Sequence, residues 1–196
     1  MRIAVFASHG GSLLQAIIDA CAVESLSADI ALVVSNNSKS KALQRAAENN
    51  IPAVHLSAST HPKDAALDGA ILEQLVNANV EWVILAGYMR KLGPLTLSKY
   101  RSHIINTHPA LLPRYGGEGF YGSKVHAAVL EAGDKETGAT VHLVEAEYDS
   151  GPILSQVRVP VRPNDTLESL EHRVKNAERN LLIATLMELP HQRKAG

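Results

Sequence analysis

Residues 3–18 read IAVFASHGGSLLQAII, and this stretch decides the fold class. It begins with a short apolar run, which is typical of a strand buried on both faces. A Ser-His-Gly-Gly-Ser turn follows, and Leu14, Ile17 and Ile18 then recur at helical spacing. The stretch therefore predicts a strand, a glycine turn and a helix, which together form the repeating unit of a parallel α/β sheet.

The same alternation continues through the first half of the chain. Further strands are expected at residues 30–34, 52–56, 82–86 and 103–106, with helical patterns before the second and third of these four. Strands that alternate with helices predict a parallel sheet covered by helices on both faces.

The later part has a different pattern. Residues 139–144 alternate as in a half-buried strand, and residues 153–161 place every second side chain on one face. Only a short turn separates these two strands, so they should be antiparallel. A long last helix follows, which Asp165 or Thr166 is expected to cap.

These patterns predict one α/β domain over residues 1–196. We expect a doubly wound, mainly parallel sheet that is Rossmann-like in its N-terminal half, with antiparallel strands near the C-terminus and a long C-terminal helix. This domain is expected to consist of two halves that meet at about residue 100.

Composition narrows the class of protein. The formal net charge of −1 argues against a general nucleic-acid or membrane surface. Cys21 is the single cysteine, so no intramolecular disulfide can form. The N-terminal apolar run is too short for a signal peptide, and no run reaches the length of a membrane span. We therefore expect a cytoplasmic protein, as a monomer or a homodimer.

The glycine turn has two interpretations. Gly10, Gly11 and Ser12 precede a helix, whose first N–H groups can bind a phosphate, but a tight turn needs no ligand. The turn is not a dinucleotide fingerprint, because the G-x-G-x-x-G spacing is absent. The second strand also ends in Ser35-Asn36-Asn37, without the acid that would bind a ribose.

A second candidate site follows the strand at residues 103–106. Asn106 and His108 are two positions apart, so both side chains can point to one side at the end of the strand. Their chemistry alone leaves catalysis and local structure equally open. The pair lacks the ligand count of a zinc site, so no metal is expected. Asp149 lies in a glycine-proline turn and is by itself a weak signal.

Taken together, these segments resemble the folate-dependent formyltransferase family. The resemblance rests on Asn106-x-His108-Pro109-x-Leu111-Leu112-Pro113 and on the later Asp149-x-Gly151-Pro152. Further similar segments are the glycine turn, residues 85–92, 114–122, 125–126, 138–142 and 177–179, so that the resemblance covers about residues 1–180. In that family a formyl group passes from 10-formyl-tetrahydrofolate to an amine, and here the resemblance implies glycinamide ribonucleotide as the acceptor, a small molecule of purine synthesis.

The resemblance also implies residue roles. Catalysis is assigned to Asn106, His108 and Asp149, whose carboxylate is expected to favour the imidazolium. The substrate amine is assigned to Glu178, which is expected to reach inward beside Ala177 in the last helix. The substrate phosphate is assigned to Gly10, Gly11, Ser12 and Leu13, with help expected from the glycine loop at Gly116 and Gly117. The folate is assigned to Met89, Arg90, Lys91 and Leu92, and to Asn106, Thr140 and Asp149.

The chain departs from the family in the glycine turn, because Leu13 stands where asparagine is usual and His9-Gly10 stands where Gly-Asn is usual. Leu13 lies one turn before Ile17, so it is expected to pack inward. The resemblance also implies that residues up to about 100 bind the phosphate and that residues from about 101 carry catalysis and bind folate.

Other functions stay open at this stage. Relatives that act on transfer RNA carry an extra C-terminal domain, and the deformylases carry an extra N-terminal one; neither extension is expected here. A sugar-nucleotide formyltransferase is a lesser alternative. From another class, the chain could be a catalytically silent nucleotide-binding module, although the intact Asn106, His108 and Asp149 argue against this.

Overall fold

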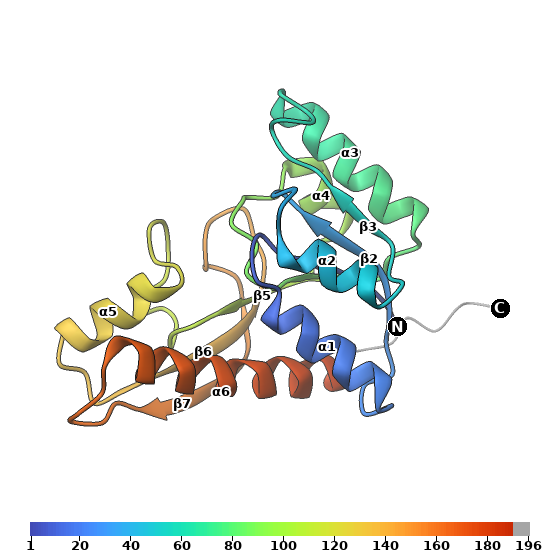
Figure 1. Cartoon of the computed structure of the whole chain (residues 1–196). Helices are drawn as coiled ribbons and strands as arrows, with labels where there is room; N and C mark the ends of the chain where they lie inside the picture. The colour runs from blue at the N-terminus through green and yellow to red at the C-terminus, as the bar shows by residue number, and fades with distance from the viewer. Residues whose placement is uncertain (190–196) are drawn as a thin grey trace. The chain divides into compact units, whose positions relative to one another are not determined.

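The computed structural model describes residues 1–189, which form two compact units. The first unit holds residues 1–105 together with Leu189, and the second holds residues 106–188. Figure 1 labels the elements of both units. One sheet contains all seven strands, in the order β3-β2-β1-β4-β5-β6-β7.

The first unit is an alternation of strands and helices. Its strands are β1 (Arg2–Phe6), β2 (Asp29–Ser35), β3 (Ala53–His55) and β4 (Trp82–Leu85). Its helices are α1 (Ser12–Ala22), α2 (Lys41–Glu48), α3 (Asp64–Asn77) and α4 (Pro94–Lys99). β1 pairs in parallel with β2 and with β4, and β2 pairs in parallel with β3.

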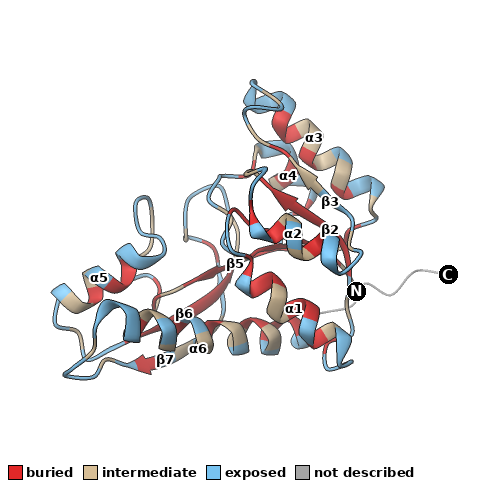
Figure 2. Cartoon of the chain, viewed as in Figure 1, coloured by how far each residue is buried: buried red, intermediate tan, exposed pale blue. Residues whose placement is uncertain are grey.

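Helices cover both faces of these parallel strands. α1 and α2 contact each other on one face, and α3 and α4 contact each other on the opposite face (Figure 1). This placement follows from right-handed crossovers that run outward to β3 and then return to β4. Because both faces are covered, β1 and β4 are almost entirely buried and apolar. Their neighbour β2 is also largely buried (Figure 2).

The first N–H groups of α4 are bound by a side chain that is distant in the sequence. Asp68 of α3 is buried, and its carboxylate accepts hydrogen bonds from the backbone N–H groups of Leu95 and Thr96, at 2.7 and 3.1 Å. It also accepts from the Thr96 hydroxyl at 2.6 Å. Asp68 therefore satisfies N–H groups at the start of α4 that no residue of the helix itself can satisfy.

The second unit begins in the middle of β5 (Ile104–His108). It continues with α5 (Ser123–Glu131), β6 (Glu136–Leu143), β7 (Ile153–Pro160) and α6 (Leu167–Glu188). β6 and β7 are antiparallel, as expected from the short turn between them. α6 packs on both of these strands and on α5, around an apolar cluster of Val129, Val159, Leu170 and Val174.

The predicted fold class is confirmed, with one correction in β6. Residues 139–144 were expected to form a half-buried strand, but the polar Thr140 and His142 are as buried as the neighbouring apolar residues. Thr140 bonds with Ala110 and Leu112 in the segment after β5, and His142 bonds with Asn106 and with the carbonyl of Leu143, so both polar side chains have hydrogen-bond partners. The expected cap of α6 is confirmed, because the Thr166 hydroxyl accepts from the N–H of Ser169 at 3.2 Å.

Candidate active site

The exit of β5 carries three polar side chains in succession. Asn106 is half-buried, whereas Thr107 and His108 are buried. Since successive side chains of a strand point to opposite faces, Asn106 and His108 share one face and Thr107 lies on the other. The amide and the imidazole therefore meet the same surroundings, as their spacing predicted.

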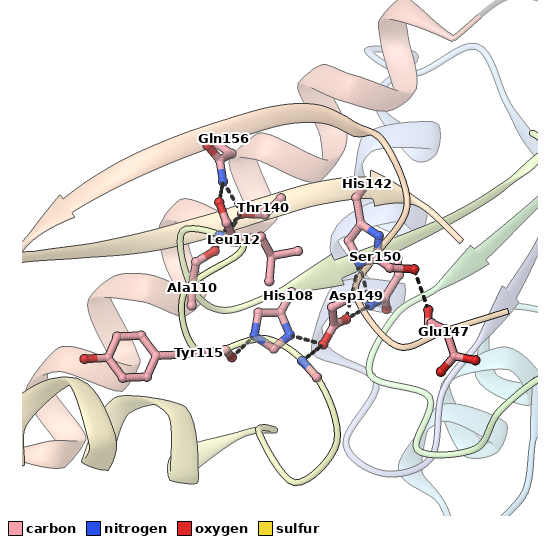
Figure 3. Close-up of polar contacts among 12 residues, drawn as sticks. His108, Ala110, Leu112, Tyr115, Thr140, His142, Glu147, Asp149, Ser150 and Gln156 are labelled. Atoms are coloured by element: carbon pink, nitrogen blue, oxygen red, sulfur yellow. Dashed lines mark hydrogen bonds and ion pairs between the residues drawn. The ribbon is translucent and has the colours of Figure 1, made fainter. Parts of the chain in front are cut away.

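Asp149 joins these two side chains. It lies in the turn between β6 and β7, with a left-handed φ of 52°. Its Oδ2 accepts a hydrogen bond of 2.9 Å from the N–H of Gly117 and lies 3.5 Å from Nδ1 of His108. Its Oδ1 lies 3.4 Å from both Nδ2 of Asn106 and Nε2 of His142. One carboxylate thus contacts an amide and two imidazoles, all within the second unit (Figure 3).

The imidazole of His108 is fixed from both of its nitrogens. Nε2 lies 2.6 Å from the backbone carbonyl of Tyr115, and Nδ1 faces Asp149. Because a carbonyl can only accept, Nε2 carries a hydrogen, and in the neutral ring Nδ1 is left with its lone pair. His108 therefore presents a base on the side of the carboxylate.

The pKa of His108 is lowered from its ordinary value of 6.5, and burial is the largest cause. Asp149 and the Tyr115 carbonyl act to raise this pKa, while His142 acts with burial to lower it. The expectation that Asp149 would favour the imidazolium is thus correct in direction, but burial outweighs it. The resting histidine is neutral near pH 7.

The pKa of Asp149 is lowered even though burial, the largest single influence, acts to raise it. The opposing influences are His142, the charge of His108 and the N–H of Gly117. The carboxylate is therefore ionised at neutral pH and can stabilise a positive charge that forms on His108.

The glycine loop after β5 fits closely against this cluster. A Cβ atom on Gly116 would lie 2.5 Å from the side chain of Leu112 and 3.3 Å from Cβ of Asp149. Gly117 donates its backbone N–H to Asp149, so this N–H group binds the carboxylate in this structure. The assistance to a phosphate that the sequence suggested for these glycines stays a prediction.

Thr140 holds the segment that leaves β5. Its hydroxyl donates to the carbonyl of Ala110 at 2.6 Å and accepts from the N–H of Leu112 at 3.1 Å. The amide of Gln156 on β7 donates to the same hydroxyl at 2.9 Å and to the carbonyl of Leu112 at 3.0 Å (Figure 3). The side chain of Thr140 is thus fully used within the protein, and its predicted contact with folate stays a prediction.

Glu178 is buried on α6, on the inward side that its position beside Ala177 predicted. Burial raises the pKa of its carboxyl, and Thr107, Lys175 and Arg179 act against this shift. The Thr107 hydroxyl makes no hydrogen bond of normal geometry with residues 1–189. A buried acid beside an unsatisfied hydroxyl is suited to a polar ligand, and the assignment to the substrate amine stays a prediction.

The glycine turn lies in the first unit. Gly11 has a left-handed φ of 63° and precedes α1, which has no side-chain cap. Gly10 and Ser12 are exposed, whereas Leu13 is buried at 7% exposure. Uncapped N–H groups behind exposed residues are the features of an anion site, but Leu13 can contribute only its backbone.

An arginine fixes this turn from α2. Nε of Arg45 donates to the carbonyl of Gly10 at 3.0 Å, and another guanidinium nitrogen donates to Gln15 at 2.6 Å. The Gly10 carbonyl therefore faces the guanidinium of Arg45 and points away from the N–H groups that follow in the turn. The sequence did not single out Arg45, because nothing in its own segment marks it as a partner of the turn.

The expected folate segment adjoins the strand before the turn. The Ser8 hydroxyl accepts from the N–H of Met89 at 2.7 Å and donates to the side chain of Asn36 at 2.6 Å. Met89 is 41% exposed, whereas Leu92 is buried. Of these two residues, Leu92 is packed as core, and Met89 is accessible to a ligand.

The structure thus groups the predicted residues within two units. Asn106, His108, Thr140 and Asp149 lie together in the second unit, which also contains Glu178. The glycine turn and residues 89–92 lie in the first unit. Ser8, which precedes the turn, connects the two segments through its hydrogen bond with the N–H of Met89. Over residues 1–189, no group of His, Cys, Asp and Glu side chains is arranged to hold a metal ion. In the same part of the chain, the helices are too short or too polar to cross a membrane.

Comparisons with known proteins give a consistent result. The family model described as Formyl transferase matches residues 1–186. A phosphoribosylglycinamide formyltransferase of Mycobacterium tuberculosis is 40% identical over 188 residues, which are 96% of this chain and 84% of that protein. The chloroplastic phosphoribosylglycinamide formyltransferase of Arabidopsis thaliana is 38% identical over 98% of this chain, which spans 66% of that protein.

A solved structure has the same fold. Glycinamide ribonucleotide transformylase 1 from Geobacillus kaustophilus aligns with a TM-score of 0.89 and 40% identity, over 95% of this chain and 97% of that chain. At this level of identity and coverage, the similarity extends beyond the fold to the family.

Proposed function

The chain belongs to the formyl transferase family, and on that premise we propose that it transfers the formyl group of 10-formyl-tetrahydrofolate to the primary amine of glycinamide ribonucleotide. Two curated relatives are named phosphoribosylglycinamide formyltransferase, which supports the acceptor and the transferred group. We infer that the reaction is a step of purine synthesis. The observation that carries the proposal is the contact of a single carboxylate, Asp149, with both Asn106 and His108 at the exit of β5.

The reaction requires a donor for a developing oxyanion. When the amine attacks the formyl carbon, a nitrogen–carbon bond forms and negative charge grows on the formyl oxygen. The amide of Asn106 supplies the donor. Its Nδ2 reaches His142 at 3.1 Å and Asp149 at 3.4 Å, and the longer of these contacts is the one that the formyl oxygen can replace.

A proton must also move from the attacking nitrogen to N10 of the folate as the old carbon–nitrogen bond breaks. Neutral His108 can take this proton on Nδ1, where Asp149 stabilises the imidazolium, and can then release it to N10. The lowered pKa of His108 suits the first step, because the ring is unprotonated near neutral pH. No covalent enzyme intermediate is needed.

The two substrates are assigned to other segments. The phosphate of the ribonucleotide is assigned to backbone N–H groups of Gly10, Gly11, Ser12 and Leu13, and its amine to Glu178. The folate is assigned to residues 89–92 and to Asn106, Thr140 and Asp149. We also propose a cytoplasmic monomer or homodimer that acts on these small molecules alone.

An absorbance assay with 10-formyl-dideazafolate and glycinamide ribonucleotide tests the proposal. We expect turnover that needs both substrates, and a loss of ~10²-fold or more in Asn106→Ala and in His108→Ala. Release of formate without the ribonucleotide would indicate a deformylase instead. No change of the folate under any condition would contradict the proposal, provided that circular dichroism shows a folded protein.

A further inference from the structure

The amide of Asn106 is held most closely by His142. Nε2 of His142, on β6, lies 3.1 Å from Nδ2 of Asn106, whereas Oδ1 of Asp149 lies 3.4 Å from the same nitrogen. The imidazole, which Figure 3 shows beside Asp149, is 2% exposed. It is fixed at its other nitrogen as well. His142 therefore has the position to control which way the amide faces.

The backbone determines the tautomer of His142. Its Nδ1 lies 2.8 Å from the carbonyl oxygen of Leu143, which can only accept, so Nδ1 carries a hydrogen. In the neutral ring Nε2 then has a free lone pair. That nitrogen lies 3.1 Å from Nδ2 of Asn106, which is closer than Oδ1 of Asp149 at 3.4 Å.

An acceptor at this position selects one orientation of the amide. Nδ2 of Asn106 must face His142, because the amide oxygen would be repelled by the lone pair of Nε2 and by the carboxylate of Asp149. Conversely, a proton on Nε2 would oppose the N–H of Asn106. Asp149 is a weaker anchor, since its contact is longer and its Oδ2 is occupied by Gly117 and His108.

We propose that His142, as the Nδ1–H tautomer, is the positioning residue that holds the Asn106 amide with its N–H groups toward the reacting formyl oxygen. The inference rests on the proposed function for the role of Asn106, but the hydrogen bonds that carry it are independent of any substrate. His142 touches neither substrate in this mechanism and acts through Asn106.

The first test measures the tautomer in the protein without substrate. Long-range ¹H–¹⁵N NMR correlations above neutral pH distinguish a protonated from an unprotonated ring nitrogen. We expect His142 to carry its hydrogen on Nδ1, and we expect Nε2 to have the ¹⁵N chemical shift of an unprotonated nitrogen that accepts a hydrogen bond. A hydrogen on Nε2 would overturn the proposal, whatever reaction the protein catalyses.

The second test uses a matched pair of variants. In His142→Asn the shorter amide can still donate to Leu143, but it loses the acceptor near Asn106. In His142→Gln the longer amide can place an oxygen where Nε2 stood. We expect kcat to fall ~10-fold or more in His142→Asn with both KM values nearly unchanged, and to return to within about threefold of the wild type in His142→Gln. A loss that falls mainly on KM, or equal losses in both variants, would overturn the positioning role.

A double variant separates this role from a general structural one. If His142 acts through Asn106, adding His142→Asn to Asn106→Ala should cause no further loss of kcat. A further loss as large as that of the single variant would show that His142 acts elsewhere, for instance through Asp149. If the wild type does not transfer a formyl group, the proposed function is wrong, but the inferred role of His142 in orienting Asn106 can still be tested. The side-chain NMR signals of Asn106 then decide the inference, and they should move in His142→Asn and stay in place in His142→Gln.

Discussion

At His108, burial and a carboxylate act on the same imidazole in opposite directions. Burial lowers the pKa of the ring, while Asp149 at 3.5 Å raises it, and burial has the larger effect. The ring is thus a base that can accept a proton, beside an ion that stabilises the charge once it forms. A more exposed ring with the same partner would be protonated over a wider pH range and would be a poorer proton acceptor.

The substitution Asp149→Asn should lower the pKa of His108 further, because it removes the charge that opposes burial. Turnover should fall ~10²-fold, the scale for a disabled general base. NMR titration of the His108 ring measures the first effect. Asp134→Asn is a matched control, since Asp134 is also a loop acid but contacts Tyr115 and Arg114. A His108 pKa that is unchanged or raised in Asp149→Asn would contradict the coupling.

Glu178 is the second residue at which burial sets the chemistry. Its carboxyl is buried with a raised pKa, next to the unsatisfied hydroxyl of Thr107. If it binds the amine end of the ribonucleotide, Glu178→Ala should raise the KM for that substrate ~10-fold or more, with much less effect on the KM for the folate. Steady-state kinetics with each substrate varied in turn measures both values. Equal effects on the two substrates would indicate a structural role only.

At the scale of elements, the turn before α1 illustrates how a backbone can form a site. Gly11 has a left-handed conformation, and a Cβ atom there would lie 3.0 to 3.1 Å from the Cα and Cβ of Ala42 on α2. Gly10, one residue earlier, has no atom within 4 Å of such a position. The two glycines therefore differ in what they tolerate, although they are neighbours.

We expect Gly11→Val to weaken binding of glycinamide ribonucleotide at least ~10-fold, because a β-branched residue resists this conformation and pushes α2 away. Gly10→Ala is the matched control and should bind within about threefold of the wild type, since its methyl group has free space. Calorimetric titration with the ribonucleotide measures both. Similar losses in the two variants would show that the phosphate does not depend on the geometry of Gly11.

Leu13 shows which part of this element could be predicted. Its spacing to Ile17 suggested that it packs inward, and it is buried. Leucine at a position where the family has asparagine thus belongs to the core of the first unit, and the N–H groups of the turn do not depend on its side chain.

The two short helices α4 and α5 were not predicted. α4 begins on the carboxylate of Asp68, which is far away in the sequence, and α5 has too few turns for its periodicity to stand out.

At the scale of the whole molecule, the strands of the first unit followed from apolar runs, because parallel strands are buried on both faces. The antiparallel β6 and β7 followed from alternation instead. The site followed less directly. Asn106 and Asp149 are 43 positions apart, and only a motif shared with a family connected them. The carbonyl of Tyr115 and the N–H of Gly117, which fix His108 and Asp149, belong to the backbone and leave no signature in residue types.

Buried histidines give the molecule a dependence on pH that reaches beyond the site. Burial is the largest cause that lowers the pKa of both His108 and His126 from 6.5. The unfolded chain therefore binds more protons than the folded one just below this pH, and the free energy of unfolding should fall as the pH decreases through about 6.5. Glu178 acts in the opposite direction, because its raised pKa means that the folded chain holds the extra proton.

His126 allows this dependence to be measured without disturbing the proposed chemistry. It is 1% exposed on α5, and its Nδ1 has no hydrogen-bond partner among residues 1–189. Each such histidine changes the free energy of unfolding by at most about 1.4 kcal/mol per pH unit. The variant His126→Gln does not titrate, so urea unfolding from pH 7.5 to 5.5 should give a shallower loss of stability than in the wild type. Because the slope is compared, any constant loss of packing cancels. An unchanged slope would mean that His126 is protonated as readily in the folded chain as in the unfolded one.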